Sequence, residues 1–261
     1  MEIFGYLASV LIGISLGLIG SGGSILTVPV MVYLFSVSPQ LATSYSLFVV
    51  GTTSLIGVIT RLKSGAVKPD TALLFGISSV LTVYITRKFI IPRLPKVLFS
   101  IGSFEVSEAL ATMVLFAILM LLAATSMIRN KKKPELGKQP LSRARLALYG
   151  VGIGLVTGFL GAGGGFLIIP TLVLLCGLSM KEAVATSLLI IACNSLTGFV
   201  GDIGHFETNW KLLGIVTSLA AIGILIGSQM AKKINNENLK KGFGWFVLVM
   251  GIYIIIKELF L

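Results

Sequence analysis

Charged residues are scarce in this chain of 261 residues, and their scarcity excludes most soluble proteins. Only 12% of the residues are charged and 55% are hydrophobic, whereas a soluble domain carries about a quarter charged residues. The mean hydropathy is +0.99. The apolar runs are continuous, unlike the alternating ten-residue pattern of a transmembrane barrel. The composition therefore predicts an all-α, polytopic helical membrane protein.

Residues that bind metals or move protons are equally few. Cys176 and Cys193 lie inside apolar segments without metal-ligand spacing, so we expect small buried side chains and no disulfide. The single histidine, His205, lies in a loop, where a solvated or packed side chain is expected rather than a proton shuttle. The acidic residues closest to apolar segments lie near their starts: Glu105, Glu108 and Glu182. The sequence thus predicts no metal, no cofactor and no buried carboxylate relay.

The net charge of +11 is concentrated in one place. Residues 129–145, "RNKKKPELGKQPLSRAR", hold seven basic residues against the single acid Glu135. A basic loop between apolar spans is typical of a cytoplasmic loop and not of a nucleic-acid site. We therefore expect a multi-pass membrane protein, with the lipid bilayer as its surroundings and no nucleic-acid partner.

The two halves of the chain resemble each other. Residues 13–57 align without a gap with residues 154–198, and about 16 of these 45 positions are identical. The sequence predicts a first membrane repeat over 1–128, the basic cytoplasmic linker over 129–145 and a second repeat over 146–261. Each repeat has five apolar segments, expected near 3–20, 24–36, 40–60, 70–91 and 104–128, and near 146–160, 165–178, 182–200, 210–230 and 242–260.

The second segment of each repeat is short and contains Pro29 or Pro170. About 13 residues reach roughly 20 Å, less than the roughly 30 Å hydrocarbon core, so the first two segments could form a re-entrant hairpin. Five spans or three both give an odd count, which would invert the halves relative to each other. One broken span would give parallel halves.

Loop charges favour inverted halves. They place the acidic loop 201–209 outside and the basic loop 231–241 inside with the linker. The loop 87–96 carries four basic residues yet is expected outside in either scheme: Arg87, Lys88, Arg93 and Lys96.

Glycine clusters interrupt each repeat where a membrane helix should continue. Irregular backbone at membrane depth is tolerated where it is buried or lines a cavity, and a helix that starts there offers free N–H groups to an anion. Helix starts are expected at about Ser24 and Gly165. We therefore predict a small-anion site at two such starts, formed by Gly20, Ser21, Gly22, Gly23 and Ser24 and by Gly161, Gly163, Gly164 and Gly165. Close packing is the alternative, and we favour packing for Gly13, Gly17, Gly154 and Gly158.

The third segment of each repeat adds polar side chains on one helix face. Ser46 and Thr53 correspond to Ser187 and Asn194 in the alignment. These groups could complete the anion site, or the hydroxyls could bond to their own helix. Asn194 is the strongest candidate, because an amide is not satisfied in that way.

These residues resemble the sulfite exporter TauE/SafE family of membrane transporters. The resemblance rests on "GLIGSGGSILTVP" and "GFLGAGGGFLIIP", and on "ATSLLIIACNSLTG" at 185–198 with its copy "SYSLFVVGTTSLIG" at 44–57. It covers nearly the whole chain apart from the linker. It implies an inner-membrane transporter of about eight spans that exports sulfite or small organosulfonates. Tyr45 stands where the family usually has threonine.

Three functions are compared as interpretations of this sequence. The first is a secondary carrier of a small inorganic or organosulfur anion, with sulfite or a related sulfur oxyanion favoured. The second is an anion channel on the same scaffold. The third is an intramembrane hydrolase that uses Ser21, which lacks a base and is replaced by alanine at position 162 of the second repeat. The sequence favours a transporter that is not an enzyme, and it leaves open whether the chain forms a homo-oligomer.

Overall fold

A computed structural model describes residues 2–62, 66–95, 97–101, 104–129, 143–161, 163–174, 176–231 and 236–260. The first half contains α1 (Glu2–Ile19), a 3-10 helix η1 (Ser21–Leu26), α2 (Thr27–Tyr33), α3 (Pro39–Leu62), α4 (Pro69–Ile85), a π-helical turn η2 (Thr86–Ile90), a 3-10 turn η3 (Ile91–Arg93), β1 (Val97–Ile101), β2 (Phe104–Ser107) and α5 (Glu108–Arg129). The second half contains α6 (Arg143–Leu160), α7 (Gly165–Leu174), α8 (Met180–Asp202), α9 (Trp210–Met230) and α10 (Asn236–Phe260). The predicted all-α membrane class is confirmed.

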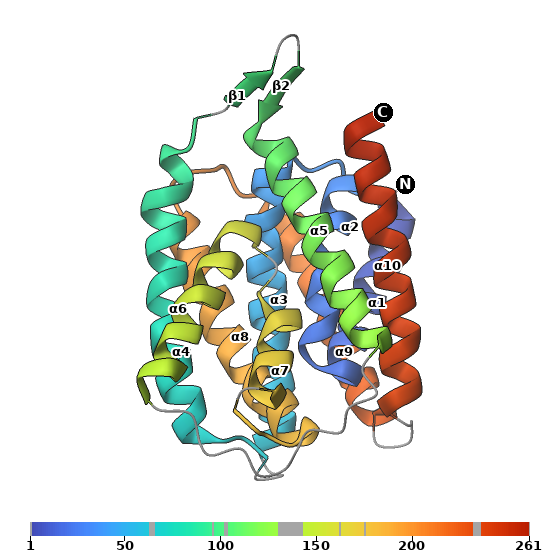
Figure 1. Ribbon diagram of the computed structural model, residues 1–261. Coiled ribbons are helices and arrows are strands. Elements are labelled where there is room, and N and C mark those ends of the chain that lie inside the picture. Colours follow the sequence, from blue (N-terminus) through green and yellow to red (C-terminus); the bar gives the residue numbers. More distant parts are fainter. Residues whose placement is uncertain are drawn as a thin grey trace.

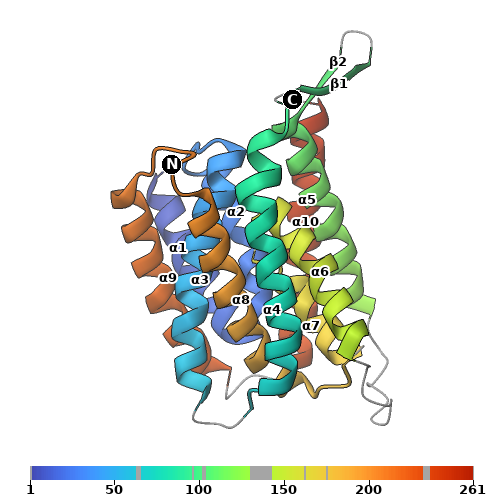
Figure 2. The ribbon, with the colours of Figure 1, turned by 90° about the vertical axis from the view of Figure 1, so that its left-hand side faces the viewer.

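The helices run along one common axis, and β1 and β2 form a small antiparallel hairpin at one end of the bundle (Figures 1 and 2). Among the described residues, five helical stretches are long and apolar enough to cross a membrane: Pro39–Ile59, Pro69–Arg93, Glu108–Ser126, Glu182–Asp202 and Trp210–Met230. Shorter apolar helices cover Ile3–Ile19, Gly23–Tyr33 and Ala144–Leu160. The expectation of several membrane segments per half is therefore met.

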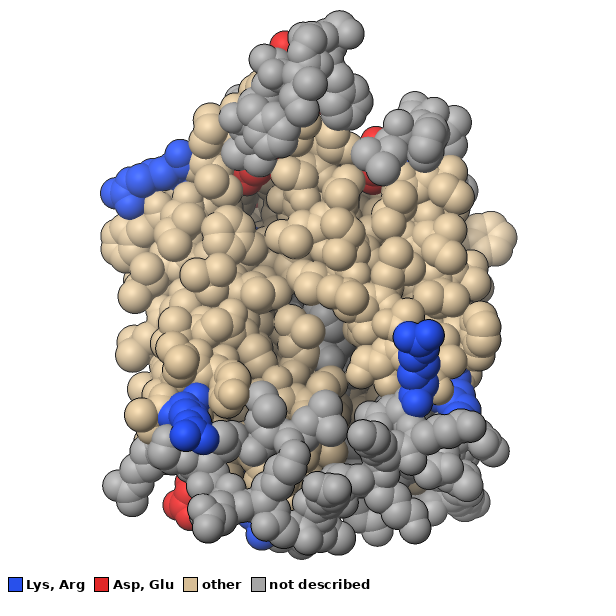
Figure 3. All heavy atoms as spheres, in the orientation of Figure 1, with Lys and Arg blue, Asp and Glu red and all other residues tan. Residues whose placement is uncertain are grey.

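Helices α3 and α8 form the centre of the bundle. In each, 72% of the apolar span is buried inside the protein, against 33% to 39% for the spans that contain α4, α5 and α9. Large apolar side chains such as Leu81, Leu122 and Val249 are exposed on the outer helices. Figure 3 shows a broad uncharged band between described charged side chains nearer the two ends. This surface suits contact with lipid acyl chains.

Two contacts show that α3 and α8 run in opposite directions. Near the start of α3, the Tyr45 hydroxyl accepts a hydrogen bond from Asn209 N just after α8 ends. Beyond the end of α3, Lys68 N donates to Thr186 Oγ1 one turn into α8. Figure 1 agrees, with α1 beginning at the hairpin end and α5 ending at the opposite end, whereas α6 begins there and α10 returns to the hairpin end.

Glycines bring neighbouring helices into backbone contact. A Cβ placed on Gly13 or Gly17 of α1 would collide with the backbone of α9, and one on Gly154 of α6 would lie 2.6 Å from the Ser79 carbonyl oxygen of α4. Gly158 is equally close to the side chain of Thr86. Packing between helices through small residues, as predicted for these four glycines, is confirmed.

Several predicted boundaries were wrong. Residues 97–107 form the β-hairpin, so α5 starts at Glu108 and not at 104. The first repeat does not start an α-helix at Ser24, because a 3-10 helix covers Ser21–Leu26 and the α-helix starts at Thr27.

The predicted burial of Cys193 was also wrong. Cys193 is exposed on α8, although both cysteines are free as expected. Glu135 and most of the linker lie outside the described residues.

Candidate functional site

The glycine clusters end two helices where the sequence predicts breaks. After α1, Gly20 has φ 77°, and after α6, Gly161, Gly163 and Gly164 have φ between 63° and 67°. Residues with side chains rarely adopt such angles, so both helices stop there. Helix α7 begins at Gly165, as predicted.

The broken segments of the two halves meet inside the bundle. Helix η1 contacts α7, and both η1 and α7 also contact the central helix α8. Ser24 in η1 and Gly165 at the start of α7 are both buried. The backbone of Ser21 and Gly22 lies in η1. The irregular segment η1 of the first half therefore packs against the helix that follows the break of the second half.

The break of the second half lies against polar groups. A Cβ on Gly163 would lie 2.8 Å from Val50 Cγ1 of α3 and 2.9 Å from Ser195 Oγ of α8. Gly164 leaves equally little room beside the Thr157 hydroxyl. The break of the first half has a different environment, since Gly20 lies against the apolar side chain of Val184 and the Ser15 hydroxyl beside Gly23 already donates to Ile12 O. Polar surroundings thus favour the break after α6 for anion contact.

The predicted polar stripe divides into two kinds of residue. The hydroxyls of Thr53 and Ser187 donate to the carbonyls of Val49 and Val184 in their own helices, at 2.5 and 2.9 Å. For these two residues the alternative of bonding within the helix holds. Ser46 is fully buried and its hydroxyl has no hydrogen-bond partner in the described part of the chain.

Asn194 bonds to another helix, as its amide requires. Its Nδ2 donates to Ser79 Oγ of α4 at 2.7 Å, and its Oδ1 has no partner among the described residues. Both side chains are fully buried. Ser79 lies about 15 Å along α4, which is close to the middle of a membrane span. Sequence reasoning missed Ser79, because "GISSV" carries no signal of a partner on α8.

Buried hydroxyls without partners gather on these helices. Ser54 of α3, Ser195 of α8 and Thr157 of α6 are fully buried and make no hydrogen bond within the described ranges. A hydroxyl can donate to an anion, whereas a buried hydroxyl left alone is unfavourable. The centre of the bundle therefore offers uncharged donors around the break at Gly163.

A buried ion pair lies at the hairpin end of the bundle. Arg87 Nη1 lies 3.0 Å from Asp202 Oδ2 and donates to Thr43 Oγ1 at 3.1 Å, with Arg87 and Asp202 side chains 1% and 3% exposed. The prediction of loop charges at both positions was wrong, because the helix continues through η2 to Arg93 and buries Arg87 against the end of α8. The apolar residues on both sides of "TRK" could have signalled this.

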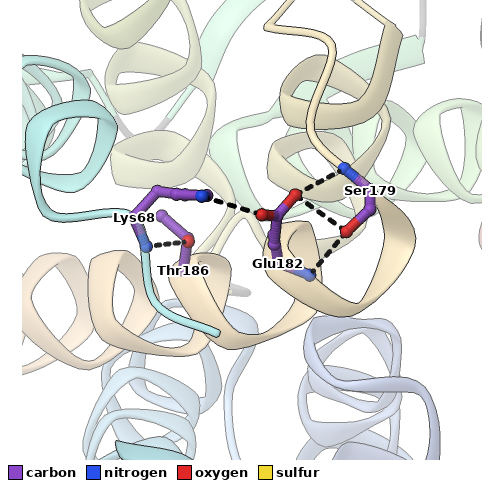
Figure 4. Close-up of polar contacts among 4 residues, drawn as sticks. All are labelled: Lys68, Ser179, Glu182 and Thr186. Atoms are coloured by element: carbon purple, nitrogen blue, oxygen red, sulfur yellow. Dashed lines mark hydrogen bonds and ion pairs between the residues drawn. The ribbon is translucent and has the colours of Figure 1, made fainter. Parts of the chain in front are cut away.

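The opposite end carries an exposed ion pair (Figure 4). Lys68 Nζ lies 2.9 Å from Glu182 Oε1, and the side chains are 47% and 29% exposed. Glu182 also completes a capping box with Ser179, which fixes the start of α8. Both ends of α8 are thus joined by opposite charges to residues that flank α4, Lys68 before it and Arg87 in η2 after it. The exposed pair contributes little to stability.

Comparisons with known proteins give one matching family model and relatives that are named as membrane transporters. A family model described as sulfite exporter TauE/SafE matches residues 6–254. A probable membrane transporter protein of Xylella fastidiosa strain Temecula1 is 26% identical over 255 residues, covering 94% of this chain and 91% of that protein. The probable membrane transporter protein YunE of Bacillus subtilis is 27% identical, covering 93% of each chain. A probable membrane transporter protein of Haemophilus influenzae is 27% identical, covering 96% and 97%.

Proposed function

Because this chain belongs to the sulfite exporter TauE/SafE family of membrane transporters, we propose that it carries a small anion across the inner membrane. Sulfite or a related sulfur oxyanion or organosulfonate is the favoured substrate. One observation carries the proposal: the glycine break after α6 lies beside Ser195 on α8, one residue from the buried amide of Asn194. Main-chain N–H groups and neutral donors bind an oxyanion without a desolvated lysine, so the anion can be released again.

We also propose that the chain consists of two inverted repeats, 1–128 and 146–261, joined by the cytoplasmic linker 129–145. The equivalent helices α3 and α8 run in opposite directions, and α1 packs on α9 as α6 packs on α4. These paired contacts are expected of a two-fold relation in the membrane plane. The burial of Arg87 also removes one basic residue from the outer loop, which eases the conflict with the loop charges.

Cysteine labelling tests this topology. In a background with Cys176 and Cys193 replaced by alanine, a cysteine at position 138 is expected to react from the cytoplasmic side and one at 205 from the opposite side. His205 is exposed in the loop between α8 and α9, so a cysteine there is reachable. A membrane-impermeant maleimide added before and after lysis gives the readout. If both positions react from one side, the inverted arrangement fails.

A carrier is favoured over a channel by the buried charges at the hairpin end. The Arg87–Asp202 pair is almost fully buried there, whereas an open channel needs a hydrated path through both ends. Proteoliposomes supply the test of function, with sulfite, thiosulfate, sulfate and ethanesulfonate offered under imposed proton or sodium gradients. We expect uphill accumulation of a sulfur oxyanion. Transport that only equilibrates would instead assign a channel, and the absence of flux for all four anions would contradict the proposed function.

A further inference from the structure

We propose that the free edge of the Arg87 guanidinium binds the transported oxyanion at the hairpin end of the bundle. This would be a second binding site on the transport path, which the anion occupies before or after it contacts the glycine break. This inference rests on the proposed function and adds a charged side chain that contacts the transported anion. The class of ligand is an oxyanion with two oxygens that can accept parallel hydrogen bonds, such as sulfite, a sulfonate or a carboxylate.

The guanidinium of Arg87 has donors on two edges, and only one edge is used. Nη1 donates to Thr43 Oγ1 and Asp202 Oδ2, while Nε and Nη2 have no hydrogen-bond partner in the residues that the structure covers. Unpaired donors on a buried cation are strongly unfavourable. The Nε and Nη2 hydrogens point the same way, and this fork matches two oxygens of one oxyanion.

The backbone around Arg87 is arranged to turn it inward. Residues Thr86–Ile90 form a π-helical turn, a rare feature that is frequently found at functional sites. It buries both Thr86 and Arg87, and the Thr86 hydroxyl also lacks a partner within the described ranges. A Cβ at Gly161 would collide with Arg87 Nη2, so glycine is needed there for the guanidinium to fit.

The same glycine links Arg87 to the centre of the bundle. Gly161 precedes Gly163 by two residues, which span at most about 7 Å. Gly163 lies beside Ser195, next to Asn194. An oxyanion on Arg87 is therefore a short step from the donors at the break.

Asp202 sets how tightly the anion is held. Its carboxylate contacts Nη1 of Arg87 and neutralises the charge of the guanidinium. Glu108 also attracts Arg87 electrostatically, and its carboxylate accepts a hydrogen bond from Gln40 at 2.6 Å. An arginine without Asp202 would attract an anion more strongly and release it more slowly. A purely structural ion pair predicts the opposite, namely that any change to Asp202 impairs the protein.

The test compares binding and flux in four purified variants, with sulfite and ethanesulfonate as probes. Dissociation constants come from the rise in melting temperature with anion concentration, and flux from proteoliposomes. Arg87→Lys keeps the charge but loses the fork, and we expect about tenfold weaker binding. Asp202→Asn keeps an acceptor for Nη1 and is expected to bind about tenfold more tightly with lower turnover. The neutral pair R87Q/D202N should lose binding, and Lys88→Gln, an exposed cation stacked on Tyr84, should match the wild type.

The outcomes separate the two proposals. If the wild type neither binds nor transports a sulfur oxyanion, the proposed function fails. If the wild type does both and Arg87→Lys keeps its dissociation constant, only the assignment to Arg87 fails. Weaker binding in Asp202→Asn would likewise overturn it. Should the variants at Asp202 not fold, the comparison of Arg87→Lys with Lys88→Gln decides alone.

Discussion

Replacing Asn194 by alanine is expected to weaken anion binding by about ten- to a hundredfold. One hydrogen bond from a buried donor to a charged ligand contributes roughly 1.5–3 kcal/mol. Asn194 Nδ2 has two hydrogens, of which one reaches Ser79 and the other remains for a ligand. The variant also removes the hydrogen bond that Asn194 donates to Ser79, so its melting temperature must be recorded beside its dissociation constant.

Two substitutions on α3 serve as controls for Asn194. Thr53 is its counterpart in the first repeat, and its hydroxyl already donates to Val49 O, so Thr53→Val should leave affinity nearly unchanged. Ser54→Ala removes a buried hydroxyl without a partner among the described residues and should weaken binding less than Asn194→Ala. Wild-type affinity in a folded Asn194→Ala protein would remove this residue from the site.

The glycine breaks and the close helix packing could be predicted because both depend on residues near in sequence. A run such as Gly161 to Gly165 ends a helix through backbone conformation alone. The spacing of Gly13 and Gly17 places both on one helix face, whatever the partner helix is. Asn194 could also be singled out, since a buried amide needs a partner on another helix.

The partners themselves could not be predicted from one sequence. Arg87 pairs with Asp202, 115 positions away, and Asn194 finds Ser79 across the same distance in sequence. Residue type also does not decide whether a hydroxyl bonds to its own helix, as Thr53 does, or stays unpaired, as Ser46 does. The π-helical turn at Thr86 also has no signal in the sequence periodicity.

Substituting Gly163 by valine is expected to abolish anion binding and transport. The structure shows why the stability of this variant must fall as well. Gly163 has φ 67°, and its missing Cβ would lie within 3 Å of Val50 and Ser195. A side chain there therefore suffers backbone strain of about 1–2 kcal/mol together with overpacking of about 1–3 kcal/mol. It would also cover the main-chain N–H groups of the break.

A matched glycine separates the loss of binding from the loss of stability. Gly177 has φ 68° but no atom within 4 Å of a Cβ, so Gly177→Ala carries only the backbone strain. Gly163→Ala carries the same strain with the crowding added. We expect both alanine variants to be recovered as folded protein, with substrate-induced thermal stabilisation retained in Gly177→Ala and lost in Gly163→Ala. If folded Gly163→Ala and Gly163→Val proteins bind and transport in proportion to the folded fraction, the glycines serve packing alone, and the anion site must lie elsewhere on α3 and α8.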